Sequence, residues 1–153
     1  MTADDAEIEA LPEPRKLIVR TMSRKFRASN FSAKVLSAYD QRCAVTRTQL
    51  KLIDAAHILP VEVPGSADSV RNGICLSPKY HRAFDHGLIY LTPELKMNLN
   101  PAKLMKLKAL NLAGGLDQFR HYLDQEIFLP ANPQQRPAAD YIRKANAFRG
   151  IAA

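Results

Sequence analysis

The sequence predicts an α+β fold, on three observations. Two short apolar runs, over residues 52–63 and 72–77, are rich in β-branched and aliphatic residues, as strands are. Residues 78–86 follow with the signals of a helix start. Helical spacing of apolar residues also occurs on both sides of this unit. With 153 residues, 46% of them hydrophobic, the chain can form one real core.

The N-terminal part is read from its charges and its apolar period. Residues 1–14 are acidic, contain two prolines and show no apolar period, so we expect a disordered acidic tail before a single domain over 15–153. The basic segment 15–29 is expected to be extended. Apolar positions from Phe31 to Tyr39 have helical spacing, which predicts a short helix there.

The central segment predicts a strand, a loop, a second strand and a short helix. The first strand falls within 52–63, and the composition of 63–69 is that of a loop. The second strand, 72–77, leads into the dipeptide Ser77-Pro78, a capping hydroxyl followed by a proline in the first helical turn. We expect the helix to end at Gly87.

The C-terminal third adds a hairpin and helices. Residues 88–100 predict a small β-hairpin around Pro93 and Glu94. Two amphipathic helices are expected within 103–112 and 114–125, and a Pro- and Gln-rich connector over 130–137 precedes a last helix over 138–148.

Charge limits the class of partner. The formal net charge is +7, and five of the 15 acidic residues lie within the first 13 positions, so the rest of the chain is more basic still. Such an excess suits a polyanion such as DNA, although a solvated basic face explains it equally well. No apolar run approaches the roughly 18 residues of a membrane span, and the N-terminus has no secretory pattern. We expect a cytoplasmic protein, with Cys43 and Cys75 as small buried residues.

Candidate catalytic residues gather in the central segment. Three of the four histidines, His57, His81 and His86, lie there, and Asn72 precedes Gly73 at the start of the second strand. Asp85 follows His81 by four positions, so a helix would place both side chains on one face. Together they offer one nitrogen and one oxygen ligand to a divalent cation: Mg²⁺, Mn²⁺, Ni²⁺ or Zn²⁺.

The motifs AAHILPV, RNGICLS and KYHRAFDHG stand in this order at short intervals. Their arrangement resembles the HNH endonucleases, within a branch that has an AHI-x-P start and an H-x-x-FD-x-G end. The segment FSAKVLSAYDQRCAVT before the motifs and IFLPANPQQRP after them resemble the same branch, so the similarity spans about residues 26–149. It implies a ββα-metal core with flanking helices, and a restriction-type enzyme that hydrolyses phosphodiester bonds.

The resemblance also implies roles for single residues. His57 would be the general base, Asn72 would hold the loop that carries His57, and His81 would act with Asp85 at the metal. Five basic residues could contact phosphates: Arg24, Lys25, Arg71, Lys79 and Arg82.

Two positions depart from the family pattern. Ala56 stands where many HNH nucleases carry a metal ligand directly before the catalytic histidine. Asp54 is near, but a residue three positions away on a strand should point to the face opposite His57. Arg47 replaces the usual glycine after CAVT, which puts the turn there in question.

These observations predict a metal-dependent DNA endonuclease, with a role in restriction or defence. Two alternatives stay open: an HNH-fold module that binds DNA with weak or lost cleavage, and a nuclease that acts on RNA. A homodimer would be one way for a protein with a single site per chain to cut both strands.

Overall fold

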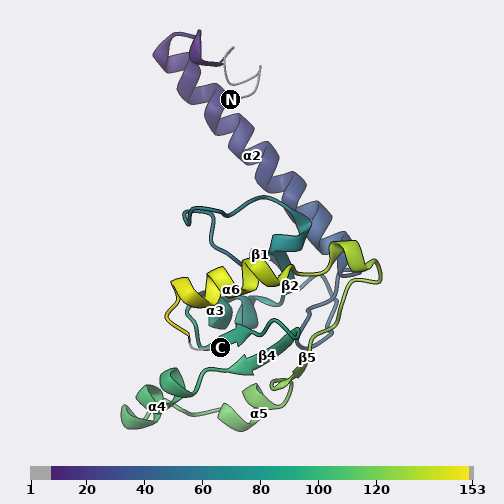
Figure 1. Cartoon of the computed structure of the whole chain (residues 1–153), viewed down its shortest axis with the longest axis vertical. Helices are drawn as coiled ribbons and strands as arrows, with labels where there is room; N and C mark the ends of the chain where they lie inside the picture. Colours follow the sequence, from purple (N-terminus) through teal and green to yellow (C-terminus); the bar gives the residue numbers. More distant parts are fainter. Residues whose placement is uncertain (1–7, 152–153) are drawn as a thin grey trace.

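The computed structural model describes residues 8–151. Two short antiparallel strands, β1 (Asp54–His57) and β2 (Gly73–Leu76), pair with His57 opposite Gly73, and helix α3 (Pro78–Asp85) follows directly. This ββα unit lies in the middle of the molecule (Figure 1). The α+β class and the ββα core with flanking helices and a hairpin are therefore confirmed.

β1 is shorter than the strand expected within 52–63. After His57 the amide of Ile58 still donates to the carbonyl of Asn72, but the amide of Leu59 donates to the Asn72 side chain instead. Pro60, which has no amide hydrogen, then begins a long loop that returns through a short 3₁₀ helix, η1 (Val70–Asn72). The apolar run continues past the strand because Ile58 and Leu59 are buried in the loop.

Helix α2 (Glu13–Ala38) corrects our expectation that 15–29 is extended. The helix predicted from Phe31 to Tyr39 is its C-terminal part, where Phe31 and Val35 are buried. The N-terminal part projects away from the rest of the molecule (Figure 1), so its apolar residues Leu17, Ile18, Met22 and Phe26 are exposed. Ile18, Met22 and Phe26 recur every four positions, a helical period that the reading of this segment as basic and extended missed. Pro14 is compatible with the helix because it lies in the first turn.

The expected acidic tail is described only in part. Residues 1–7 lie outside the described residues. Glu9 pairs with Lys16 and Arg20, and Glu13 in the first turn of α2 also pairs with Lys16. The boundary at residue 15 stays a prediction, but α2 runs across it.

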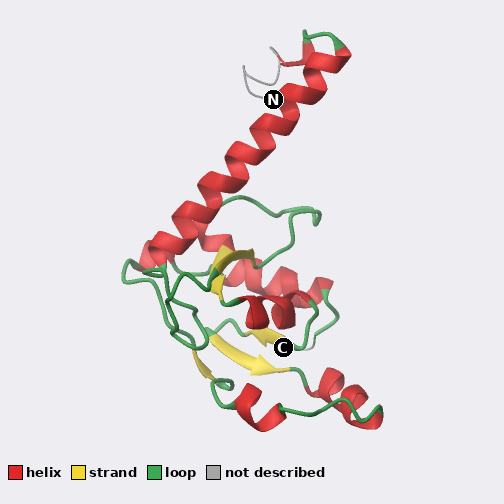
Figure 2. Cartoon of the chain, turned by 180° about the vertical axis from the view of Figure 1, so that it is seen from behind, coloured by secondary structure: helices red, strands yellow, loops and turns green. Residues whose placement is uncertain are grey.

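A second sheet packs below the ββα unit and contains the predicted hairpin. β3 (Ile89–Leu91) pairs with β4 (Lys96–Leu99), and β5 (Gln125–Glu126) adds a third strand. Figure 2 shows this sheet with the helices around it. Those helices are α4 (Pro101–Ala109), the single turn α5 (Leu116–Arg120) and α6 (Ala139–Phe148), which contacts β3. The 3₁₀ turn η2 (Pro133–Gln135) in the predicted connector contacts η1 instead.

The turn at Arg47 has a backbone conformation that favours glycine, the residue usual at this position in the family pattern. Arg47 adopts φ +66°, in the left-handed region that costs a residue with a Cβ roughly 1–2 kcal/mol. Its amide donates to the carbonyl of Cys43 at 2.8 Å, so the turn forms in spite of the cost.

One hydrophobic core connects the ββα unit with α2, the second sheet and α6. Tyr39, Ile74, Leu76, Ile89 and Ile142 are completely buried in it, as are both cysteines, which are free thiols as expected. No helix in the part of the chain that the structure describes is long and apolar enough to cross a membrane.

A substitution at Gly73 tests the close contact between α2 and the strands β1 and β2. A Cβ at this position would lie 2.3 Å from Cγ2 of Val35 and 3.1 Å from Cζ of Phe31. We expect Gly73→Ala to destabilise the protein by about 1–3 kcal/mol, because an overpacked core must shift. Urea unfolding measures this, with Gly114→Ala as the control, since nothing lies within 4 Å of its added methyl group. Equal free energies of unfolding for the two variants would contradict the packing described.

Candidate active site

Asn72 is completely buried and bonds to the loop that follows His57. Its side-chain oxygen accepts from the amide of Leu59 at 2.8 Å. Its amide nitrogen donates to the carbonyls of Leu59 and Ala67, and lies 3.2 Å from Oγ of Ser66. Every polar atom of the side chain is thus used on one loop, the arrangement expected of a residue that holds the His57 segment in place.

His57 lies between α2 and this loop. Its ring stacks on Phe31 with centroids 3.9 Å apart and planes 9° from parallel. Its Nε2 lies 3.0 Å from Oδ1 of Asp68, a loop residue that the sequence did not single out. With Nε2–H donated to Asp68, Nδ1 is the ring atom left to accept a proton.

His81 is held between two carboxylates. Nε2 lies 3.2 Å from Oδ2 of Asp85 and Nδ1 lies 3.0 Å from Oδ2 of Asp54. The hydrogen bond to Asp85 is the largest cause that raises the pKa of His81 to about 9, and Asp54 adds to it against the effect of burial. Burial raises the pKa of Asp85, but the hydrogen bond to His81 and the charges of His81, Arg149 and His86 together outweigh it, so that pKa lies below its usual value.

Asp54 was expected to point to the face opposite His57. Asp54 and His57 do contact different elements, since His57 faces Phe31 and the loop. The side chain of Asp54, however, reaches α3 and bonds to His81, one of the predicted site residues. The sequence argument from strand alternation missed this because it did not place α3 against β1.

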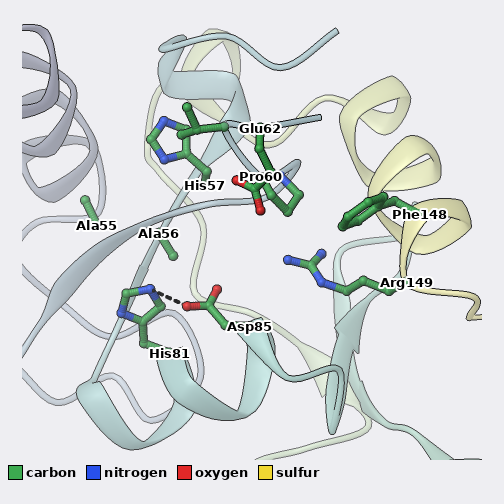
Figure 3. Close-up of a pocket in the computed structure, with 10 residues that line it drawn as sticks. Ala55, Ala56, His57, Pro60, Glu62, His81, Asp85, Phe148 and Arg149 are labelled. Atoms are coloured by element: carbon green, nitrogen blue, oxygen red, sulfur yellow. Dashed lines mark ion pairs between the residues drawn. The ribbon is translucent and has the colours of Figure 1, made fainter. Parts of the chain in front are cut away.

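One cavity of about 520 Å³ brings together three of the predicted site residues. His57, His81 and Asp85 line it, together with Glu62 from the long loop and Arg149 at the end of α6. Figure 3 shows Ala56 between His57 and the His81–Asp85 pair, with the guanidinium of Arg149 pointing toward Asp85 and Glu62. The space beside the two histidines is therefore lined by one guanidinium, that of Arg149, and by the carboxylates of Asp85 and Glu62.

Arg149 is the site residue that sequence reasoning missed. Its Nη1 donates to the carbonyl of Ile58 at 3.0 Å, and its guanidinium lies 4.8 Å from the ring centroid of Phe84. Burial lowers the pKa of Arg149, and the charges of Asp85 and Glu62 oppose that effect. A basic residue at the end of the predicted last helix was the available signal, but nothing local connected it to residues 57–85.

The donor set fits a divalent cation in part. His81 and Asp85 offer a nitrogen and an oxygen on adjacent turns of α3, as expected. Asp54 binds the other ring nitrogen of His81, the partner that metal-ligating histidines usually have. Within residues 8–151, however, no three His, Cys, Asp or Glu side chains are grouped closely enough to hold an ion by themselves.

The predicted phosphate-binding residues lie outside this cavity. Lys79 and Arg82 are exposed on α3, and Arg24 and Lys25 are exposed on α2. Arg71 is exposed too, but its Nε donates to the carbonyl of Arg136 at 3.1 Å, so it connects η1 to the C-terminal connector. Their contacts with nucleic acid stay predictions.

Comparison with known proteins agrees with this geometry. Residues 43–92 match a family model described as HNH endonuclease. The similarity to HNH endonucleases in sequence is confined to this segment. The segment contains β1, β2 and α3, and so all of the predicted HNH residues.

A solved structure resembles this chain over more of its length. A modification dependent TagI restriction endonuclease superposes with a TM-score of 0.52 at 22% identity, over 81% of this chain. The chain spans only 38% of that enzyme's own length, so the likeness concerns the fold. A comparison with curated proteins finds no match.

The charge state of His81 in this HNH site can be tested by titration. Its pKa of about 9 exceeds the ordinary 6.5, so the protonated pair stabilises the folded protein fully below pH 6.5, and this stabilisation is lost as the pH rises to 9. In protein treated with EDTA, we expect NMR to show the ring of His81 titrating near pH 9. Asp85→Asn should lower that midpoint, and Asp140→Asn on α6 should leave it unchanged. A midpoint near 6.5 in the unsubstituted protein would contradict the pairing.

Proposed function

We propose that this protein is a metal-dependent endonuclease that hydrolyses DNA phosphodiester bonds. The observation that carries the proposal is the cavity in which His57, His81, Asp85 and Arg149 meet. Phosphodiester hydrolysis needs a base for water, a way to stabilise charge on the phosphate, and a protected place for both. The cavity offers a candidate for each task.

His57 would take the proton from the attacking water. The contact with Asp68 would fix the ring's tautomer, and the stack on Phe31 would fix its plane. Asn72 would act through position alone, since its bonds run to the loop and not to the cavity. His57 and Asn72 would thus have the roles that the HNH resemblance implies.

His81 and Asp85 would hold the divalent cation, with Asp54 orienting the ring of His81. A bound cation would supply Lewis-acid stabilisation of the charge that develops on the phosphate and the leaving oxygen. Because ligation needs a neutral imidazole, binding of the cation would release the Nε2 proton that His81 shares with Asp85.

Arg149 would bind a nonbridging oxygen of the phosphate to be cleaved. Its guanidinium points into the cavity and is held there by Ile58 and by the face of Phe84. Arginine suits this task because its planar donors match phosphate oxygens and it stays charged even when partly buried.

DNA is the substrate class that the charge and the fold favour. The basic excess suits a polyanion, and the structural neighbour is by its title a restriction endonuclease. We extend to this chain the proposal of a role in restriction or defence. The cytoplasmic location and the homodimer stay predictions.

One observation favours a second function, a DNA-binding module with weak or lost cleavage. Ala56 offers no ligand between His57 and the His81–Asp85 pair, and the described residues supply fewer than three grouped ligands. Binding of DNA without cleavage under every metal would support this alternative against the enzyme.

Cleavage assays test the proposed chemistry. We expect plasmid DNA to be cut with Mg²⁺, Mn²⁺, Ni²⁺ or Zn²⁺ and to stay intact in EDTA. His57→Ala should lower the rate by about 10²–10⁴-fold, the usual contribution of a general base. His121→Ala is the matched control, because His121 lies next to α5 and does not line the cavity. Cleavage that persists in EDTA or in His57→Ala would rule out this mechanism, and an RNA substrate in parallel tests the remaining alternative.

Arg149 has its own test. We expect Arg149→Ala to lower kcat by about 10²–10³-fold, as when one donor to a developing oxyanion is removed. Arg149→Lys should recover part of the loss, because it keeps a positive charge without the planar donors. Arg143→Ala removes the same charge from an exposed position of α6 and should cleave at the normal rate. If both alanine variants cleave equally well, Arg149 does not contact the phosphate.

A further inference from the structure

A second cavity adjoins the candidate active site. It measures about 510 Å³ and is lined by Tyr90 on β3, by Lys103 and Lys106 on α4, and by the segment from Arg149 to Ile151. Arg149 lines both cavities and so stands between them. Among residues 8–151, no acidic residue lines the second cavity, which sets it apart from the first.

Buried hydrogen bonds fix the start of α4 against the end of α3. Asn100 is 8% exposed, and its amide nitrogen donates to the carbonyl of Gly87 at 2.9 Å. Its backbone amide donates to the carbonyl of Leu88, and its side-chain oxygen caps α4 by accepting from the amide of Ala102. Since Gly87 lies two residues after Asp85, α4 begins beside the helix that carries the predicted metal ligands.

The two lysines therefore have a defined position relative to the candidate active site, because the start of α4 is fixed. Cε of Lys103 lies 3.9 Å from the point where a Cβ on Gly87 would stand. Lys106 follows three residues later, on the same side of α4. Within residues 8–151 neither lysine forms an ion pair, so both ammonium groups are available to an external anion.

The other wall is fixed as well. Asn146 is 4% exposed and donates from its side chain to the carbonyl of Leu91 at the end of β3. Its own carbonyl accepts from the amide of Ile151, which closes the C-terminal end of α6 around Gly150 at φ +69°. The chain from Arg149 to Ile151 thus has a defined position between the two cavities.

We propose that the cavity of Lys103 and Lys106 binds a backbone phosphate of the nucleic acid strand that is cut, next to the phosphate held at His57, His81 and Arg149. The inference rests on the proposed nuclease function, because it needs a strand in the first cavity. Adjacent cavities with a shared arginine suit a polyanion with regularly spaced charges. A pair of lysines in a cavity whose described lining has no acid suits phosphate rather than a base edge. The two lysines would set the register of the strand and would not take part in the chemistry.

A charge-matched pair of variants tests this site. Lys103→Gln/Lys106→Gln removes the two cations, and Lys96→Gln/Lys108→Gln removes two exposed lysines that do not line the cavity. Binding of a fluorescent duplex in EDTA is measured by anisotropy over a range of salt. We expect the first variant to bind about tenfold more weakly, with the slope of log Kd against log salt smaller by about one to two. The control should change both quantities much less.

Neutral replacements of single phosphates show which phosphate the two lysines contact. A methylphosphonate replaces each phosphate in turn on either side of the cleaved bond. At one position next to the cleaved bond, the methylphosphonate should weaken binding to the unsubstituted protein. The same methylphosphonate should not weaken binding to Lys103→Gln/Lys106→Gln any further, because that variant has already lost the contact. Losses that simply add at every position would overturn the inference.

The two proposals fail in different ways. If the unsubstituted protein cleaves DNA but the lysine pair and its control behave alike, the phosphate site is wrong and the nuclease function stands. If the protein binds DNA without cleavage and the lysine pair still shows the expected losses, the catalytic proposal fails and the binding site stands. If the protein does not bind nucleic acid at any salt concentration, both are wrong.

Discussion

The hydrogen bonds of Asn72 are the constraint on which the site depends. The long loop between β1 and β2 carries Asp68, the partner of His57, and Glu62, which lines the cavity. This loop has little regular structure of its own, and the buried Asn72 side chain bonds to it near both ends, at Leu59 and Ala67. Because these groups are buried, breaking one bond would leave an unsatisfied donor or acceptor, at a cost of roughly 1–3 kcal/mol.

Close packing around Gly73 gives His57 its second support. The residue paired with His57 has no side chain, so α2 approaches the strands and brings Phe31 onto the imidazole ring. The helix that carries Phe31 extends far beyond the core, so its C-terminal part builds the site while its N-terminal part remains exposed (Figure 1). A single small residue at the start of β2 thus links the packing of the fold to the orientation of the candidate base.

Local patterns in the sequence were enough for the ββα unit and for the spacing of His81 and Asp85, because the strand, turn and helix signals lie within 35 residues of one another. The interpretation failed for 15–29, which was read from its basic charge although Ile18, Met22 and Phe26 recur at helical spacing. Local patterns could not find Arg149, Asp68 or the contact of Asp54 with His81. Each of these depends on the tertiary arrangement, and Arg149 lies 91 residues from its partner Ile58.

The position of Asp54 changes the meaning of Ala56. A carboxylate at position 56 would lie between His57 and the His81–Asp85 pair, where it could share a cation with them. The carboxylate of β1 stands instead at position 54, two residues earlier and on the same side of the strand, and contacts Nδ1 of His81 from outside the cavity. There it can only orient the imidazole and support its charge. The strand therefore contributes to the site through the hydrogen bond of Asp54 to His81. In the proposed mechanism, the space beside Ala56 would take the phosphate and the water.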